Sequence, residues 1–161
     1  MHPTIRRFAT GDSHAVLRLS LLAWEPVFAA WLRILGPELY PIAIYEDWRV
    51  SQGEAVERIC HDEEILTWVA VVGGDVAGFV SYKLDDDSKT GEVELLAVSP
   101  DHQSRGVGTA LNDFALAKMK EAGMRLAVAG TGDDEGHAPA RRSHEKAGHT
   151  ALPLARYYKR L

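Results

Sequence analysis

The feature that most constrains the fold is a β-rich run, a glycine-containing turn and an amphipathic helix, which follow one another between Glu92 and Gly123. The run from Glu92 to Val98 predicts a strand, and Pro100 ends it. Apolar residues from Leu111 to Ala122 recur at helical spacing, and Gly123 is typical of a helix C-cap. The turn therefore lies at a helix N-terminus, where backbone N–H groups without intrahelical acceptors favour an anion.

The turn reads Gln103-Ser104-Arg105-Gly106-Val107-Gly108 and is followed by Thr109. Its two glycines let the main chain approach a ligand closely, and Arg105 adds positive charge, so a diphosphate fits physically. The turn lacks the G-x-x-x-x-G-K-[ST] pattern of a P-loop and the third glycine of a dinucleotide fingerprint. We also expect the preceding strand to pair antiparallel with its predecessor, unlike the strands of a βαβ unit. Both nucleotide-binding folds are therefore disfavoured.

The remaining elements indicate an α+β domain. Strands are expected at 4–8, 65–72, 76–84 and 124–129, and Gly73-Gly74-Asp75 predicts a hairpin. Helices are expected after Ser13, after the capping box Ser51 to Glu54, and over 138–147. The segment from Trp24 to Trp48, rich in aromatics and interrupted by prolines, predicts short helices and loops. The tail around Pro153 predicts one or two further strands.

Size and charge set broader limits. The 161 residues fit a single domain over 1–161, and the net charge of −5 argues against broad nucleic-acid binding. A single cysteine, Cys60, excludes an internal disulfide. No apolar run approaches the roughly 18 residues that span a bilayer, so we expect no membrane segment and a cytoplasmic location. A monomer or a homodimer is expected.

Three motifs resemble those of the GNAT superfamily of N-acetyltransferases. The family's acetyl-CoA loop reads Q/R-x-x-G-x-G/A, and Gln103, Gly106 and Gly108 fill it. The run from Glu92 to Pro100 is similar to the family's fourth strand, and Glu145-Lys146-Ala147-Gly148 is similar to the end of its last helix. The resemblance implies a mixed, mostly antiparallel twisted sheet of six to seven strands, flanked by about four helices. It also implies a cleft where the fourth and fifth strands splay apart.

The resemblance implies that acetyl-CoA, the acetyl donor, lies in that cleft. Pantetheine is expected on the strand at Leu96, Ala97 and Val98. Pyrophosphate is expected on the loop, at Gln103, Ser104, Arg105, Gly106, Val107, Gly108 and Thr109. The last helix of the family begins at an Asn that contacts pantetheine and carries a Tyr that protonates the CoA thiolate. In this chain His137 stands at the Asn position and His144 at the Tyr position, so both are expected to contact the cofactor.

The predicted chemistry needs a proton acceptor, a proton donor and an acceptor pocket. Glu92 and Glu94 alternate on a strand and point to one face, where either could take the amine proton directly or through water. An imidazolium at His144 could protonate the thiolate near neutral pH. No metal is expected, because the nearby histidines lack an acidic or Cys ligand at helical spacing. The predicted acceptor pocket contains Trp24, Phe28, Trp31 and Tyr40, and the acids Glu25, Glu38, Glu46 and Asp47 lie near them in the sequence.

Two functions remain open on this evidence. The first is an N-acetyltransferase that moves an acetyl group from acetyl-CoA directly to a primary amine of a small molecule or peptide. The second is a catalytically weak or inactive module of the same fold that binds acyl-CoA for regulation. In the second function, His144 at the Tyr position and His149, which replaces the family's usual Phe after Gly148, mark lost catalysis.

Overall fold

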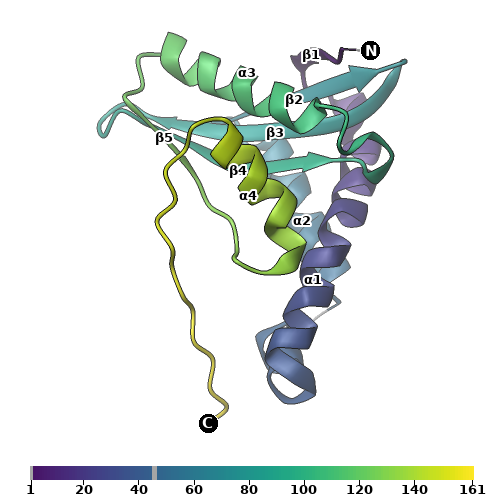
Figure 1. The fold of residues 1–161 in the computed structure, drawn as a ribbon. Helices are drawn as coiled ribbons and strands as arrows, with labels where there is room; N and C mark the ends of the chain where they lie inside the picture. Colours follow the sequence, from purple (N-terminus) through teal and green to yellow (C-terminus); the bar gives the residue numbers. More distant parts are fainter. Residues whose placement is uncertain (1, 45–46) are drawn as a thin grey trace.

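A computed structural model describes residues 2–44 and 47–161. Within these residues one sheet of five strands runs through the molecule in the order β1-β2-β3-β4-β5, and helices lie on both sides of it (Figure 1). The first four strands pair antiparallel, and β4 and β5 pair parallel. The strands are β1 (Thr4–Arg7), β2 (Ile65–Val72), β3 (Asp75–Asp85), β4 (Thr90–Val98) and β5 (Leu126–Ala129).

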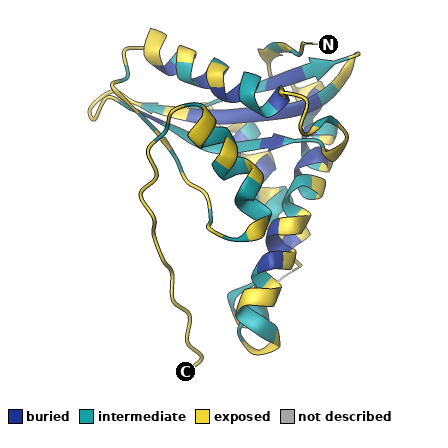
Figure 2. Cartoon of the chain, viewed as in Figure 1, coloured by how far each residue is buried: buried dark blue, intermediate teal, exposed yellow. Residues whose placement is uncertain are grey.

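Two apolar layers hold the helices to the sheet. The α-helices are α1 (Ser13–Ala43), α2 (Trp48–His61), α3 (Val107–Glu121) and α4 (Ala138–Lys146), and the short 3-10 turns are η1 (Thr10–Asp12), η2 (Pro100–His102) and η3 (Glu135–His137). Phe79 belongs to the layer under α1 and α2, whereas its neighbour Val80 belongs to the layer under α3, because successive strand residues face opposite ways. Figure 2 shows the buried residues concentrated on the sheet and on the helix faces toward it.

The hairpin and the strand–loop–helix unit are confirmed. β2 ends at Val72 and β3 begins at Asp75, and Gly73 and Gly74 have φ angles of 61° and 94°. Positive φ at both central residues matches a type I′ turn, which is easiest for glycine. α3 begins at Val107 and is followed by Gly123, whose φ angle of 82° fits a C-cap.

β4 and β5 separate part of the way along their length, as predicted. Their pairing covers only Thr90–Val93 of β4 against Leu126–Ala129 of β5. β4 runs on to Val98, so its last five residues have no neighbour on the β5 side among the described strands. A register shift in the β3–β4 pairing leaves Glu94 without an opposite residue, which indicates a β-bulge at the point of separation.

The sequence prediction for residues 24–48 was wrong for the part before Gly36. Instead of short helices and loops, α1 continues through Pro26 as far as a break at Gly36, where φ is 72° and ψ is 176°. An interior proline costs about 3 kcal/mol because it removes a helical hydrogen bond, but the buried side chains of Val27 and Phe28 offset that cost. Pro37 follows the break, at the start of the next helical segment, where a missing N–H does no harm.

The expected six to seven strands were also too many. Residues 147–161 form no strand, and the tail runs away from the sheet (Figure 1). Pro153 lacks the N–H that a ladder needs, and the outer edge of β5 offers only four residues for pairing. α2 also begins earlier than the Ser51 capping box predicted, because the Asp47 carboxylate accepts a hydrogen bond from the Arg49 N–H at 3.0 Å.

α1 also departs from the expectation that no segment is apolar enough to cross a membrane. By length and composition, Thr10 to Ala43 passes that test. In the structure, however, Val16, Leu19 and Phe28 of this helix are buried, and α1 contacts α2, β3 and β4. α1 thus packs on the sheet and α2 along one side, whereas its residues Leu22, Leu32 and Ile34 are exposed.

Candidate functional site

A cavity of about 380 Å³ lies where β4 has separated from β5. Its walls are the end of β4, the loop before α3, the η3–α4 segment and one side of α1. The lining residues are Leu96, Ala97, Val98, Gln103, Ser104, Gly106, Gly108, Thr109, Gly136, His137, Pro139, Ala140, Arg142, Ser143, Lys146, Ala23, Trp24 and Val27. Three regions that are distant in sequence thus converge on one space: α1, the β4–α3 connection and the η3–α4 segment.

The loop before α3 lines this cavity, and its backbone has the conformation of an anion site. Ser104 and Gly106 both have left-handed φ angles, 60° and 83°. Left-handed residues in a turn gather successive N–H groups into a concave anion site. The first intrahelical bond of α3 joins the Ala110 N–H to the Gly106 carbonyl at 2.9 Å, so the preceding amides lack intrahelical acceptors. Gln103 Nε2 donates to the Val98 carbonyl at 3.1 Å and ties the loop to β4.

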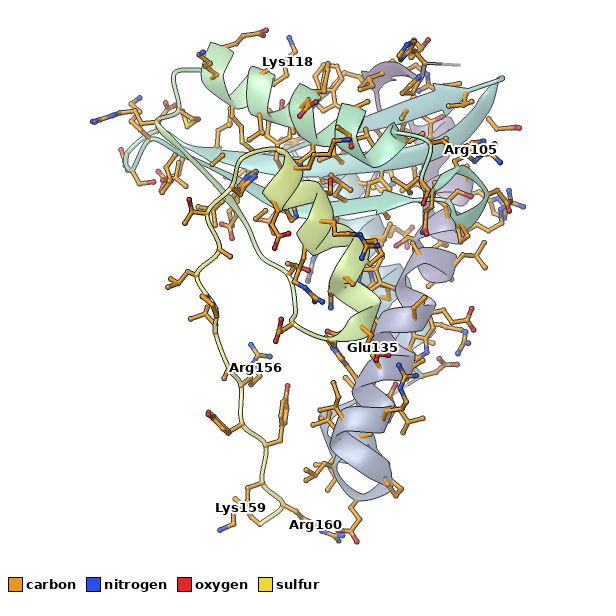
Figure 3. All side chains as sticks on the ribbon, viewed as in Figure 1. Arg105, Lys118, Glu135, Arg156, Lys159 and Arg160 are labelled. Carbon is orange, nitrogen blue, oxygen red and sulfur yellow. The ribbon has the colours of Figure 1, made fainter. Side chains whose placement is uncertain are left out.

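The structure brings most of the predicted cofactor residues together. Nine of them line the cavity, namely Leu96, Ala97, Val98, Gln103, Ser104, Gly106, Gly108, Thr109 and His137. The other three do not. Arg105 points outward from the loop (Figure 3). Val107 is only 2% exposed and packs in the core under α3, and His144 lies in the α3–α4 interface.

His144 contacts a buried amide instead of the cavity. Asn112 Nδ2 lies 3.3 Å from His144 Nδ1 and 3.4 Å from the Ser143 carbonyl. Burial lowers the pKa of His144, and the neighbouring His149 lowers it further. The ring is therefore neutral at neutral pH, whereas the predicted proton donor is an imidazolium. This surrounding does not favour the predicted donor role.

Glu92 and Glu94 share one face of β4, as predicted, but both are held by a lysine. Lys83 Nζ lies 3.4 Å from Glu92 Oε2 and 2.7 Å from Glu94 Oε1. The hydrogen bond to Glu94 is the main reason that the pKa of Lys83 is raised. Neither carboxylate lines the cavity. Glu94 is two residues from Leu96, about 7 Å along the strand, and Glu92 about 13 Å.

The predicted aromatic residues have different surroundings. Trp24 lines the cavity. Phe28 is 8% exposed and stacks on Trp48 with ring centroids 4.5 Å apart, so it belongs to the core. Trp31 Nε1 donates to Asp134 Oδ2 at 3.2 Å. Tyr40 lies beyond the break in α1 and does not line the cavity.

Of the acidic residues near the predicted pocket in the sequence, none that the structure describes lines the cavity. Glu25 pairs with Arg49 at 3.5 Å, and Asp47 caps α2. Glu38 is not a lining residue, and Glu46 lies outside the described residues. Within the described chain, no three His, Cys, Asp or Glu side chains converge as a metal ion requires.

Sequence reasoning missed Asp134. Its Oδ2 lies 2.6 Å from His137 Nδ1, and its side chain is 5% exposed. Arg141 Nη1 donates to the carbonyl oxygens of Gly132, at 2.6 Å, and Asp134, at 2.7 Å, which fixes the bend before η3. The spacing Asp134 to His137 is a local signal, since an Asp three residues before a helical position is typical of an N-cap.

Comparisons with known proteins agree with this geometry. The model of the acetyltransferase (GNAT) family matches residues 24–149. Mycothiol acetyltransferase of Beutenbergia cavernae is 35% identical over 115 residues, which cover 70% of this chain and 36% of that relative, so the match spans about a third of the relative's length.

Solved structures show the same fold. A GNAT-family acetyltransferase from Desulfovibrio desulfuricans superposes with a TM-score of 0.69 at 25% identity, covering 94% of this chain and 87% of its own. An N-acetyltransferase from Thermoplasma acidophilum, solved in complex with coenzyme A, has a TM-score of 0.70 at 17% identity, covering 96% of this chain and 94% of its own.

Proposed function

This chain belongs to the GNAT family of acetyltransferases, and from that premise we propose that it transfers an acetyl group from acetyl-CoA directly to a primary amine of a small molecule or peptide. One observation carries the proposal. The unpaired end of β4 and the loop before α3 line the same cavity of about 380 Å³. In acetyl-CoA the pantetheine amides and the diphosphate are neighbouring parts of one linear chain, so binding it needs both surfaces side by side.

The two surfaces suit different parts of acetyl-CoA. The diphosphate is proposed to accept hydrogen bonds from the amides between Ser104 and Thr109, at the positive end of the α3 dipole. The pantetheine amides are proposed to pair with the open edge of β4 at Leu96 to Val98, as an added strand would. Backbone groups would therefore supply much of the affinity, and side chains little of it.

The charges on the cavity wall bear on the acceptor. The charged side chains of the lining are Arg142 and Lys146, and the described lining contains no carboxylate. A polycation would be repelled there, so the acceptor we propose carries one amine on an otherwise neutral or acidic body. The α1 side of the wall, with Ala23, Trp24 and Val27, offers apolar contact to that body.

The proposed reaction needs a neutral amine and two proton movements. The amine nitrogen attacks the thioester carbonyl carbon, the carbon–sulfur bond breaks, and CoA leaves as a thiolate. Glu94, the nearer of the two predicted carboxylates, would act only through water, because it does not line the cavity. His144→Phe tests the predicted donor. A large fall in turnover at unchanged acetyl-CoA affinity would support the proton-donor role of His144, and unchanged turnover would contradict it.

Two measurements test the proposed function. Calorimetry with acetyl-CoA measures binding, and a thiol-release assay measures turnover with a panel of amines. The panel includes peptides, amino sugars, polyamines and, because a relative is named mycothiol acetyltransferase, small amines that carry a thiol. We expect binding and turnover with at least one monoamine. Tight binding without turnover on any amine would favour the regulatory acyl-CoA-binding function, which the surroundings of His144 also suit.

A further inference from the structure

We propose that His137, held by Asp134, is the base that takes the proton from the acceptor amine. The inference rests on the proposed acetyl transfer and assigns a proton acceptor for it. His137 is a lining residue of the cavity, and its Nδ1 lies 2.6 Å from Asp134 Oδ2. Neither of the sequence-predicted carboxylates lines this cavity.

The contact to Asp134 sets which ring nitrogen is basic. A carboxylate bound at Nδ1 favours the tautomer with hydrogen on Nδ1, which leaves the lone pair on Nε2. Within residues 2–44 and 47–161, Nε2 has no hydrogen-bond partner. A ring fixed at one nitrogen and open at the other is the arrangement that a general base needs.

Asp134 stays ionised although its side chain is almost fully buried. Burial by itself would raise the pKa of Asp134, but hydrogen bonds from His137 and Trp31 outweigh burial and lower it. Trp31 Nε1 donates to the same Oδ2 at 3.2 Å, and the His137 N–H donates to Oδ1 at 3.3 Å. The carboxylate therefore carries a full charge with which to orient the imidazole.

The backbone around the pair is held against α1. A Cβ on Gly136 would lie 2.5 Å from Val27 Cα, so this segment packs against the helix with no room for a side chain. In Figure 3, Glu135 lies beside α1 at the start of α4, and its carboxylate is 3.1 Å from Arg33. The base thus stands in η3, which contacts both α1 and α4, and α1 carries Trp24 on the same cavity.

The proton balance is simple. The amine nitrogen forms a bond to the thioester carbonyl carbon, its N–H proton moves to His137 Nε2, and the carbon–sulfur bond breaks. The imidazolium then releases that proton to solvent, and the CoA thiolate takes one up. The sum is amine plus acetyl-CoA giving N-acetyl product plus CoA thiol, with His137 neutral again.

His137→Asn is the sharpest variant, because Asn is the usual residue of the family at this position and keeps a pantetheine contact while removing the base. We expect kcat/KM for the amine to fall by about 10²- to 10⁴-fold at nearly unchanged acetyl-CoA affinity. His14→Asn, an exposed histidine on α1, is the matched control. In His137→Ala, added imidazole should restore part of the turnover, which a merely structural role would not allow.

Asp134 is a positioning residue, so Asp134→Asn should lower kcat by about 10- to 100-fold with little change in KM. The control is Asp133→Asn, because the side chain of the neighbouring Asp133 is fully exposed. Proton NMR should show a low-field Nδ1–H signal that Asp134→Asn removes. If the wild type turns over an amine and His137→Asn is fully active, the assignment of His137 and Asp134 is wrong, but the proposed acetyl transfer stands. If the wild type turns over no amine, the proposed acetyl transfer is wrong, and so is the role of His137 and Asp134 in it.

Discussion

Gly108→Glu would place a carboxylate where we propose that the diphosphate binds. Gly108 is the second residue of α3, and it lines the cavity. A Cβ at this position would meet only Val98 Cγ2, at the ordinary contact distance of 3.5 Å, so the substitution does not strain the fold. An acidic residue in the first turn also suits the helix dipole, so stability should be kept or raised by up to about 1 kcal/mol.

The expected loss of affinity follows from Coulomb's law. Two unit charges about 4 Å apart interact by about 4 kcal/mol at an effective dielectric constant near 20. About 1.4 kcal/mol corresponds to a factor of ten, so the full repulsion would weaken binding by about 10³-fold. Part of it is lost to solvent screening, because the loop is open on one side, and we therefore expect acetyl-CoA to bind at least about 100-fold more weakly.

Calorimetry with acetyl-CoA and thermal melts of the same samples measure the two effects separately. Gly108→Ala is the matched control, because the family motif accepts alanine at this position, and its affinity should stay within about threefold of the wild type. An unchanged melting temperature with lost binding supports the diphosphate site. A Glu variant that binds acetyl-CoA as tightly as the Ala variant would refute the placement of the diphosphate on this loop.

Three further predictions concern stability. A Cβ on Gly136 would lie 2.5 Å from the α1 backbone, whereas one on Gly130 would meet nothing within 4 Å. Urea unfolding should therefore show that Gly136→Ala is less stable than the wild type by about 1–3 kcal/mol, and that the stability of Gly130→Ala is nearly unchanged. The hydrogen bond from Arg6 lowers the pKa of Asp12, so Asp12→Asn should cost about 1–2 kcal/mol at pH 7, and the difference should vanish as the pH falls below the ordinary value of 3.8. Burial lowers the pKa of His144, so the unfolded state binds more protons, and wild-type thermal stability should decline below the ordinary pKa of 6.5; a decline of the same size in His144→Gln would contradict this.

The sequence predicted correctly those parts of the fold whose conformation depends on a few neighbouring residues. The Gly73-Gly74 turn needs positive φ at both residues, and the sequence places glycine at both. The loop from Gln103 to Gly108 was recognisable because its glycines come immediately before a helical apolar pattern. Both features depend on residues close together in the chain.

Long-range packing decided the rest. α1 continues through Pro26 because the side chains of Val27 and Phe28 are buried. This burial depends on tertiary contacts, which the local sequence pattern does not show. The hydrogen bond from Trp31 to Asp134 joins residues 103 apart, and no spacing within either segment predicts it. Sequence reasoning placed Glu92 and Glu94 on one face of β4, but it did not predict that Lys83, on the neighbouring strand, would hold the Glu94 carboxylate.

The most direct test of the central claim is amide hydrogen exchange with and without acetyl-CoA. The account predicts that the cofactor slows exchange in two segments, the loop and first helical residues from Ser104 to Thr109 and the open end of β4 from Leu96 to Val98. Gly108→Glu should lose both effects. Slowed exchange confined to another region, or none at all under saturating acetyl-CoA, would contradict the assignment of this cleft as the acetyl-CoA site.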